Sequence, residues 1–112
     1  MTFEEVCQMI RTFRQERDWD QFHDPKDLAI SISLEAAELL EAFQWSKEDC
    51  WVPEKRDEML EELADILIYC VHMADCLGAD IPKIMSDKMA RNAEKYPVEK
   101  ARGTAKKYNA LD

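Results

Sequence analysis

Two long stretches of this chain combine the pattern of an apolar helix with acids inside the apolar stripe. The first, SLEAAELLEAFQW (33–45), has helix-forming residues throughout and places Glu35 and Glu38 three residues apart. One acid takes a place in a series of apolar residues at steps of four, three and four: Leu28, Ile32, Glu35 and Leu39. Since positions three or four apart share a helix face, Glu35 lies on a face that would otherwise be buried. The pattern predicts helices that pack along their length.

The second stretch, EELADILIY (61–69), repeats this arrangement with Glu62 and Asp65. Burying unpaired carboxylates is costly, and no Arg or Lys lies within one turn of Glu35 or Glu38. The alternative of solvated acids on amphipathic helices therefore fits these positions less well. Carboxylate oxygens are the ligands that Mg²⁺ prefers, with Mn²⁺ as a possible substitute, whereas zinc prefers His and Cys. A ferritin-like di-iron site would need a His three residues after an acid, which neither stretch has.

Glycine and proline are scarce, with two and four copies among 112 residues, which leaves little room for the turns of an all-β fold. Apolar periodicity predicts helices over about 2–17, 25–45, 53–77 and 82–95. Four helices with short connections make an all-α, four-helix bundle. We expect one domain over 1–97 and a flexible tail over 98–112. The second and third helices are apolar on nearly every face, which predicts a dimer or a dimer of dimers.

Several residues mark the predicted helix ends. Thr2 followed by Glu5 resembles a capping box, and Asp24 before Pro25 suits the start of the second helix. Gly78 is a natural stop for the third helix. The first helix is expected to bury one stripe, formed by Phe3, Val6, Ile10 and Phe13.

The net charge of −9 argues against adhesion to a nucleic acid polymer or to an anionic membrane. No apolar run approaches the roughly 18 residues of a membrane span, and the segment MTFEEVCQMI does not resemble a signal peptide. The cysteines form no CxxC pair, and we expect them to be reduced, buried thiols of a cytoplasmic protein: Cys7, Cys50, Cys70 and Cys76.

A polar, mostly basic strip is predicted near the end of the fourth helix. Its members lie at i, i+3, i+4 and i+7: Lys88, Arg91, Asn92 and Lys95. Taken alone, this strip is better explained as a solvated helix surface in which Asp87 pairs with Arg91. In a protein of charge −9 with an acidic metal cleft, a concentrated basic strip also fits phosphate binding.

Aromatic residues lie near the acidic segments and are candidates for stacking on a nucleobase. Trp19 and His23 belong to one loop, and Trp45 ends the second predicted helix. Trp at a helix end is as often a core residue, and His23 could equally hydrogen-bond within its loop. His72, on an apolar helix, is expected to be a core residue, and together with Cys76 it does not make a zinc site.

Three motifs, LEAAELLEAFQW, EELADILIYCVHMADCLGADI and KMARNAEKYP, together resemble the MazG-like all-α nucleoside triphosphate pyrophosphohydrolases over about residues 3–97. The segment RDWDQFHDPKDLAISI is most similar to the small dCTP-pyrophosphatase branch. The resemblance implies Mg²⁺ ligands at Glu35, Glu38, Glu62 and Asp65. It implies phosphate contacts at Lys88, Asn92, Lys95 and Tyr96. It also implies a base and sugar pocket lined by His23, Trp45 and Tyr69.

The family reaction cleaves the α–β phosphoanhydride, which gives a nucleoside monophosphate and pyrophosphate. The resemblance therefore implies nucleotide-pool housecleaning with dCTP-like or modified pyrimidine substrates, by dimers or tetramers that often complete the site across an interface. Glu38 is the first choice for the carboxylate that orients or deprotonates the attacking water. Two alternatives stay open: activity on phosphoribosyl-ATP or dUTP with the same scaffold, and a non-catalytic helical oligomerisation scaffold.

Overall fold

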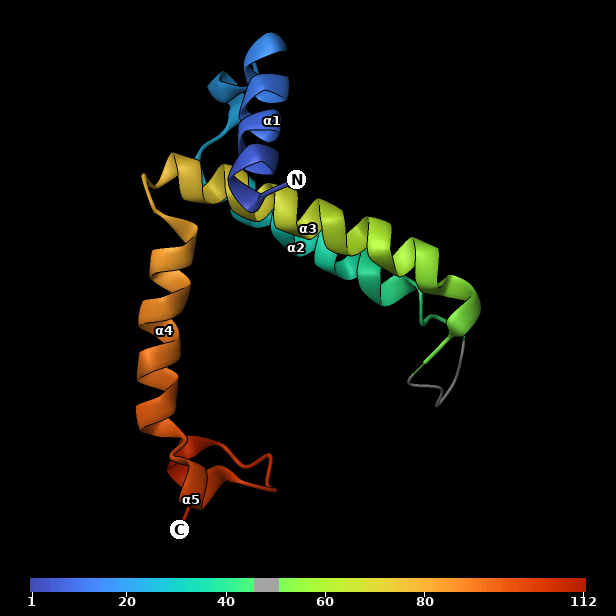
Figure 1. Cartoon of the computed structure of the whole chain (residues 1–112). Coiled ribbons are helices and arrows are strands. Elements are labelled where there is room, and N and C mark those ends of the chain that lie inside the picture. The colour runs from blue at the N-terminus through green and yellow to red at the C-terminus, as the bar shows by residue number, and fades with distance from the viewer. Residues whose placement is uncertain (46–50) are drawn as a thin grey trace. The chain divides into compact units, whose positions relative to one another are not determined.

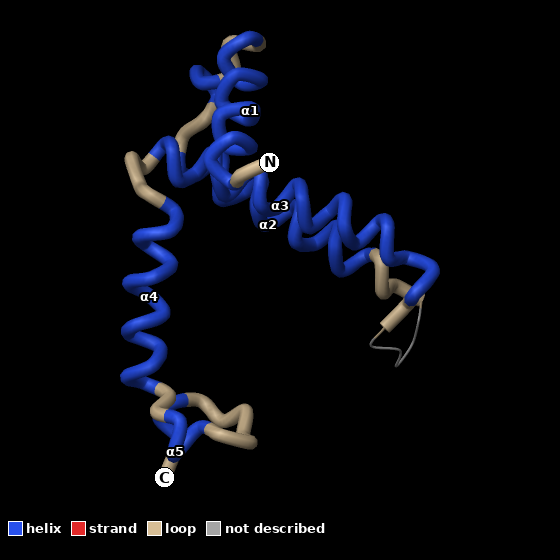
Figure 2. Tube along the Cα trace, in the orientation of Figure 1, coloured by secondary structure: helices blue, strands red, loops and turns tan. Residues whose placement is uncertain are grey.

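The computed structural model describes residues 1–45 and 51–112, and every regular element in these ranges is helical (Figures 1 and 2). The long helices are α1 (Phe3–Glu16), α2 (Pro25–Glu41), α3 (Arg56–Cys76) and α4 (Ile81–Lys95). Shorter elements are the helix α5 (Val98–Ala101) and the 3₁₀ turns η1 (Asp20–Phe22), η2 (Pro53–Lys55) and η3 (Tyr108–Ala110). The predicted all-α class is confirmed. Within the described ranges, no helix combines the length and the apolar character that crossing a membrane requires.

The chain divides into two compact units, Met1–Ala79 and Asp80–Asp112. This division does not coincide with the predicted boundary after residue 97. In the second unit the segment after α4 has structure of its own, because α5 follows directly and the ring of Tyr108 lies 6.2 Å from that of Tyr96. The flexibility of this segment stays a prediction.

In the first unit, α2 and α3 lie side by side and run in opposite directions, and α1 packs against α3 (Figure 1). Leu28 of α2 is the most deeply buried large side chain, with 1% of its surface exposed. Val71 and Ala74 of α3 and Cys7 of α1 are also buried. These residues form a core at the N-terminal half of α2 and the C-terminal half of α3, and Ala42 and Val52, near the other end of this helix pair, are buried as well.

Much apolar surface of this unit stays exposed. Leu60, Leu63 and Leu67 follow one another at steps of three and four on α3, and each is about half exposed. Leu34 and Leu40 of α2 are exposed to 60% and 70%. Stripes of this kind are typical of surfaces that bury themselves by association. They support the predicted self-association, although the oligomeric state itself stays a prediction.

The predicted helix ends are confirmed at three positions. The side-chain oxygen of Thr2 accepts a hydrogen bond from the Glu5 N–H at 3.1 Å. The carboxylate of Asp24 accepts one from the Asp27 N–H at 2.8 Å, and a proline begins α2. After α3, Gly78 takes the left-handed backbone conformation, with φ +64°, that favours glycine.

The predicted end of α2 near residue 45 is wrong, because the helix ends at Glu41. Beyond it, hydrogen bonds to the third preceding residue replace the helical pattern, as between the Phe43 N–H and the Leu40 carbonyl at 3.0 Å. Trp45 then has a positive φ of 72° and is 90% exposed, so it follows the helix instead of ending it. The start of α3 also differs, since the proline expected to open it forms η2 instead.

The predicted buried stripe of α1 is rotated. Cys7 and Arg14 are the buried residues of this helix, whereas Phe3 and Phe13 are 52% and 48% exposed. The physical reason is an ion pair, since the Arg14 guanidinium lies 3.0 Å from the carboxylate of Asp75 on α3. Spacing of apolar residues within α1 cannot reveal a partner that lies so far along the chain.

Asp75 is the anchor between α1 and α3. The Arg11 Nε and Nη2 atoms donate to its carboxylate at 3.1–3.2 Å, and Arg14 Nη1 donates at 3.0 Å. Burial alone would raise the pKa of Asp75, but the hydrogen bonds and charges of the two guanidinium groups outweigh this effect and lower it. The lowered pKa means that the ionised carboxylate stabilises the folded state.

The cysteines were expected to be buried thiols, and this is only partly right. Cys7 is buried and Cys70 is half-buried, but Cys76 is exposed. All three are free thiols. Cys50 lies outside the described residues.

The Asp75→Asn substitution is expected to lower the free energy of unfolding by about 2 kcal/mol at neutral pH, because it leaves two guanidinium groups without their carboxylate. The Asp87→Asn variant is the control. Its partner Lys83 lies at 2.8 Å, but both side chains are at least half exposed, so only a few tenths of a kcal/mol are expected. Urea unfolding followed by circular dichroism measures both losses.

Acidification provides a second test of the same anchor. The pKa of Asp75 is lower in the folded protein than its ordinary value of 3.8, so its contribution is present above that value and is lost as the pH falls through the folded pKa. The stability difference between wild type and Asp75→Asn should therefore shrink as the pH is lowered below 3.8. A difference that stays constant, or a loss at neutral pH no larger than that of Asp87→Asn, would contradict the role of this anchor.

Candidate metal and nucleotide site

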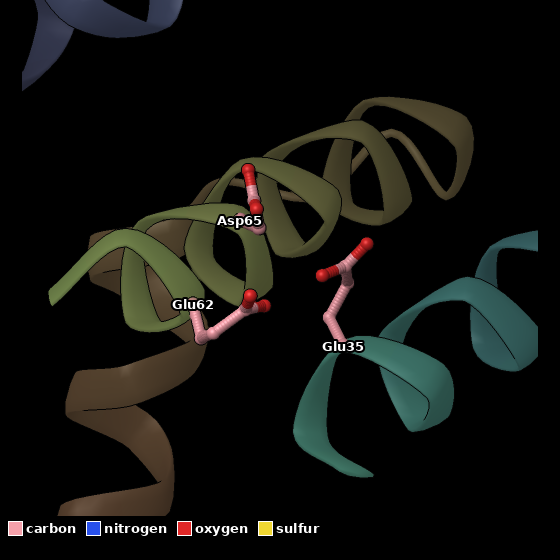
Figure 3. A group of neighbouring side chains, drawn as sticks. All are labelled: Glu35, Glu62 and Asp65. Carbon is pink, nitrogen blue, oxygen red and sulfur yellow. The ribbon is translucent and has the colours of Figure 1, made fainter. Parts of the chain in front are cut away.

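Three of the four predicted acids converge between α2 and α3. Glu35 extends from α2 toward α3, where Glu62 and Asp65 lie on adjacent turns (Figure 3). One carboxylate oxygen from each residue lies within 4.8 Å of those of the other two. The arrangement follows from the sequence, because a step of three places Glu62 and Asp65 on one face of α3, and the antiparallel neighbour supplies Glu35. The preceding acid, Glu61, is exposed and does not belong to this group.

The acids of the cluster are held partly away from water. Glu35 and Glu62 are half-buried, and the Oε2 atom of each is buried without a hydrogen-bond partner among residues 1–45 and 51–112. Burial raises the pKa of Glu62 to about 7, and hydrogen bonds with Glu35 and Glu38 and their negative charges add to this effect. Burial and the contact with Glu38 also raise the pKa of Glu35, against an opposing hydrogen bond with Glu62. Near neutral pH, Glu62 is therefore close to the point at which its carboxylate takes up a proton.

Glu38 lies one turn after Glu35 and is exposed, so it borders the cluster on its open side. It interacts with both Glu35 and Glu62 but does not belong to the tightest group of ligand atoms. Asp65 is also exposed. Of the four predicted acids, Glu35 and Glu62 are thus half-buried, whereas Glu38 and Asp65 are exposed.

The donor set fits a hard divalent cation. Among the residues that the structure describes, the ion pairs formed by Lys and Arg involve none of the four acids. The converging donors are all carboxylate oxygens, and two buried oxygens have no hydrogen-bond donor. Mg²⁺ and Mn²⁺ bind such oxygens and supply the missing positive charge. Glu35, Glu62 and Asp65 could hold the ion, with Glu38 beside them.

A second group of predicted site residues meets at the C-terminal end of α3. His23, which precedes α2, lies with its ring centroid 4.6 Å from that of His72. The centroid of the Tyr69 ring lies 5.9 Å from that of the His72 ring. Tyr69 is one turn after Asp65, so the aromatic group and the acids share a face of α3. The expectation that His72 is a buried residue is confirmed, since it is 7% exposed.

The two tryptophans in the predicted substrate-binding set lie elsewhere. Trp19 packs edge-on against Phe13 of α1, with ring centroids 5.7 Å apart. Trp45 lies four residues beyond the C-terminal end of α2, whereas His23 lies just before its N-terminal end. A helix of 17 residues is about 25 Å long. One copy of the chain therefore does not bring Trp45 and His23 to the same base.

The predicted phosphate-binding residues belong to the second unit. Lys88 is exposed on α4, and Asn92 is half-buried, with its carbonyl accepting the Tyr96 N–H at 2.8 Å. The Lys95 ammonium lies 4.9 Å from the centroid of the Tyr108 ring, a cation–π contact that sequence spacing did not indicate. The expected pairing of Asp87 with Arg91 is wrong, because Asp87 pairs with Lys83 at 2.8 Å. The partner of Asp87 therefore lies one turn before it and not one turn after it.

Comparison with known proteins decides the family. Residues 30–111 match the MazG-like family. The chain belongs to the MazG-like family. It is 39% identical to dCTP pyrophosphatase 1 of Rattus norvegicus and 37% identical to that of Homo sapiens. Both alignments cover 98% of this chain and 68% of the relative.

A solved structure supports the same assignment for this MazG-like chain. A pyrophosphatase from Archaeoglobus fulgidus superposes with a TM-score of 0.70 at 38% sequence identity. The match covers 84% of this chain and 91% of the archaeal one. The resemblance to MazG-like proteins and to their dCTP-pyrophosphatase branch, inferred from the motifs, is confirmed.

The Glu62→Gln substitution tests whether the acids of this MazG-like protein form a cation site. In the presence of a chelator, the variant should be at least as stable as wild type, because one repelling carboxylate is gone. With millimolar Mg²⁺ or Mn²⁺, wild type should gain thermal stability and the variant should not. Glu61→Gln removes a neighbouring exposed acid and should behave like wild type. Equal stabilisation of all three proteins by the metal would exclude this site.

Proposed function

We propose that this MazG-like chain hydrolyses dCTP-like or modified pyrimidine nucleoside triphosphates at the α–β phosphoanhydride with the help of Mg²⁺. Family membership and similarity to dCTP pyrophosphatase 1 over nearly its whole length make it a nucleoside triphosphate pyrophosphohydrolase. The observation that carries the proposal is the convergence of Glu35, Glu62 and Asp65 from two helices. The same similarity argues against a non-catalytic scaffold.

The acidic cluster suits the cation that triphosphate hydrolysis requires. We assign Glu35, Glu62 and Asp65 as ligands, because their oxygens converge and two of them bury an oxygen that has no donor. A bound divalent cation would neutralise the triphosphate and lower the pKa of a coordinated water. Mg²⁺ is the proposed ion, and Mn²⁺, which accepts the same ligands, is the substitute.

Glu38 is the proposed general base. It is exposed at the mouth of the cluster, so its carboxylate is free to orient a water and to accept the water's proton. The oxygen of this water forms a bond to the α-phosphorus, and the bond from the α-phosphorus to the bridging oxygen breaks. The electron pair leaves with pyrophosphate, where we assign Lys88 and Lys95 to stabilise the developing charge. Asn92 and Tyr96 complete the proposed phosphate contacts.

The base pocket is proposed to include His23, Tyr69 and Trp45, with Trp19 as a further aromatic candidate. The cytosine preference is supported by the relatives, which are named dCTP pyrophosphatase 1. Phosphoribosyl-ATP and dUTP are the alternative substrates on the same scaffold. We also propose a cytoplasmic location, which agrees with the free thiols of Cys7 and Cys70.

Self-association is part of the proposal, because one copy cannot bring the pocket residues together. His23 and Trp45 lie beyond opposite ends of α2, about 25 Å apart along the helix axis. The exposed leucines of α2 and α3 offer an apolar surface to a second copy. We propose a dimer, or a dimer of dimers, in which Trp45 of one copy serves the base site of another.

Substitution of the proposed base and of one proposed ligand tests the chemistry. Glu38→Gln should lower Mg²⁺-dependent turnover of dCTP by at least about a hundredfold, the range expected for loss of a general base. Asp65→Asn, which removes a proposed metal ligand, should also lower this turnover strongly, and the helical circular dichroism of both variants should stay unchanged. Glu41→Gln, which removes an exposed acid one turn beyond Glu38, is the control and should stay active.

The products and the substrate panel complete this test. Release of pyrophosphate and dCMP is expected, whereas release of inorganic phosphate would point to attack at a different phosphorus. A panel of dCTP, modified cytosine triphosphates, dUTP and phosphoribosyl-ATP, assayed with and without Mg²⁺, ranks the alternatives. Undiminished pyrophosphate release by both variants would rule out the proposed site.

Mixed oligomers test the shared pocket. His23→Ala and Trp45→Ala should each be weakly active alone. Refolding the two variants together should restore about a quarter of wild-type activity, because half of randomly formed dimers are mixed and each has one intact site. Mass spectrometry shows whether the mixture contains mixed dimers. If it does and activity is not recovered, His23 of one copy and Trp45 of another do not form one site.

A further inference from the structure

A polar cavity of about 100 Å³ lies where α1, the loop before α2 and the end of α3 meet. Its lining combines three elements and several charged or hydrogen-bonding groups: Arg14, Asp20, His23, His72, Asp75 and Cys76. None of these residues belongs to the acidic cluster, and only His23 was in the predicted site. Apolar packing alone does not require so many polar groups around one cavity.

Contact with Arg14 determines which ring nitrogen of His72 carries the proton. Its Nη1 atom lies 3.0 Å from His72 Nδ1 and 3.0 Å from Asp75 Oδ2, and an arginine can only donate hydrogen bonds. His72 Nδ1 therefore accepts, and the neutral ring carries its proton on Nε2. Burial, His23 and the charge of Arg14 lower the pKa of His72 to about 4, which keeps the ring neutral. With Arg14 and His72 only 6% and 7% exposed, the pair has little freedom to move.

His72 is the link between the two rings of the proposed base pocket. Its centroid lies 4.6 Å from that of His23 and 5.9 Å from that of Tyr69. His23 is also contacted through its carbonyl, which lies 3.6 Å from the Cys76 sulfur. Its Nδ1 atom is buried without a hydrogen-bond partner among the described residues. The orientation of His23 therefore depends on ring contact with His72.

The positions along α3 connect this contact to the acidic cluster. Glu62, Asp65, Tyr69 and His72 follow one another at steps of three, four and three, so they share one helix face. His72 lies seven residues after Asp65, about 10 Å along the helix axis. This distance is suited to the separation between the phosphates and the base of one nucleotide.

We propose that His72, held by Arg14, is a positioning residue that orients His23 toward the edge of the nucleobase. The inference rests on the proposed function, in which His23 lines the base pocket. A neutral imidazole nitrogen can accept a hydrogen bond from the exocyclic amino group of cytosine, whereas a protonated imidazole can only donate. A neutral His23 held with its accepting nitrogen toward the base would therefore favour cytosine over uracil.

Nuclear magnetic resonance tests the contact without catalysis. The chain has two histidines, so a variant at His72 leaves a single imidazole signal, that of His23. In His72→Ala this signal should shift and broaden relative to wild type, because the ring loses the partner that orients it. His72→Phe keeps a ring at this position and should restore a sharp signal. An unchanged His23 signal in His72→Ala would overturn the proposal even if the enzyme hydrolyses dCTP.

Kinetics test the consequence for recognition. In His72→Ala the ratio of kcat/KM for dCTP to that for dUTP should fall about tenfold, the scale of one misaligned hydrogen bond. The loss should appear mainly in KM for dCTP, with kcat little changed, and His72→Phe should recover most of it. An unchanged ratio in a folded His72→Ala variant, or an equal loss for both nucleotides, would overturn the positioning role.

Val71→Ala is the matched control, since Val71 is buried next to His72 in the sequence and its truncation lowers stability while the His72 ring that contacts His23 stays in place. It should lower the melting temperature by an amount similar to His72→Ala and leave the dCTP to dUTP ratio unchanged. A ratio that falls in Val71→Ala as well would show that lost stability, and not ring contact, causes the effect. Failure of the wild type to hydrolyse either nucleotide would refute the proposed function, while the magnetic resonance result would still decide whether His72 orients His23.

Discussion

The antiparallel contact between α2 and α3 is the constraint on which the site depends. It sets Glu35 against Glu62 and Asp65 although like charges repel, and no lysine or arginine of the described residues forms an ion pair with them. Two oxygens are buried without donors from the part of the chain that the structure describes, and burial raises the pKa of Glu62 to about 7. A fold selected only for stability would replace such groups with apolar ones. Unfavourable interactions that persist in a folded protein are typical of functional sites.

The buried apolar residues of this unit lie toward the ends of the helix pair, with Ala42 and Val52 at the end away from α1. Leu28, Val71 and Ala74 are buried near the end of the helix pair where α1 joins it, and Asp75 anchors two arginines there. The acids lie nearer the middle of α2 and α3, where leucines on the outer stripes stay exposed. Packing toward both ends keeps the two helices in register, and this register brings acids from different helices together.

Much of the fold could be predicted from local sequence patterns, whereas contacts between residues far apart in the sequence could not. The capping residues, Gly78 and the acid spacing are local patterns, and each led to the observed structure. The rotated face of α1 could not be predicted, because the buried Arg14 contacts His72 and Asp75, which lie about 60 residues later in the chain. The early end of α2 arises from hydrogen bonds to the third preceding residue, which leave no signature in apolar spacing. His23 and Tyr69 were predicted as pocket residues, but the contact of both rings with His72 was missed, because His23 and His72 come from separate elements.

The two ends of the proposed site differ in charge, and this difference gives each end its own task. At the acidic end, the proposed role of the carboxylates is to hold a cation and, through it, the triphosphate. At the aromatic end, the charge of Arg14 is balanced, because Asp75 accepts its hydrogen bond and its Nε lies 2.6 Å from Asp20 in an ion pair that is not an aligned hydrogen bond. Burial lowers the pKa of both His23 and His72, so the rings there stay neutral. In the proposed function, binding strength would therefore depend on the acidic end, which would bind the metal and the phosphates. Selectivity would depend on the neutral end, where hydrogen-bond direction can distinguish an amino group from a carbonyl.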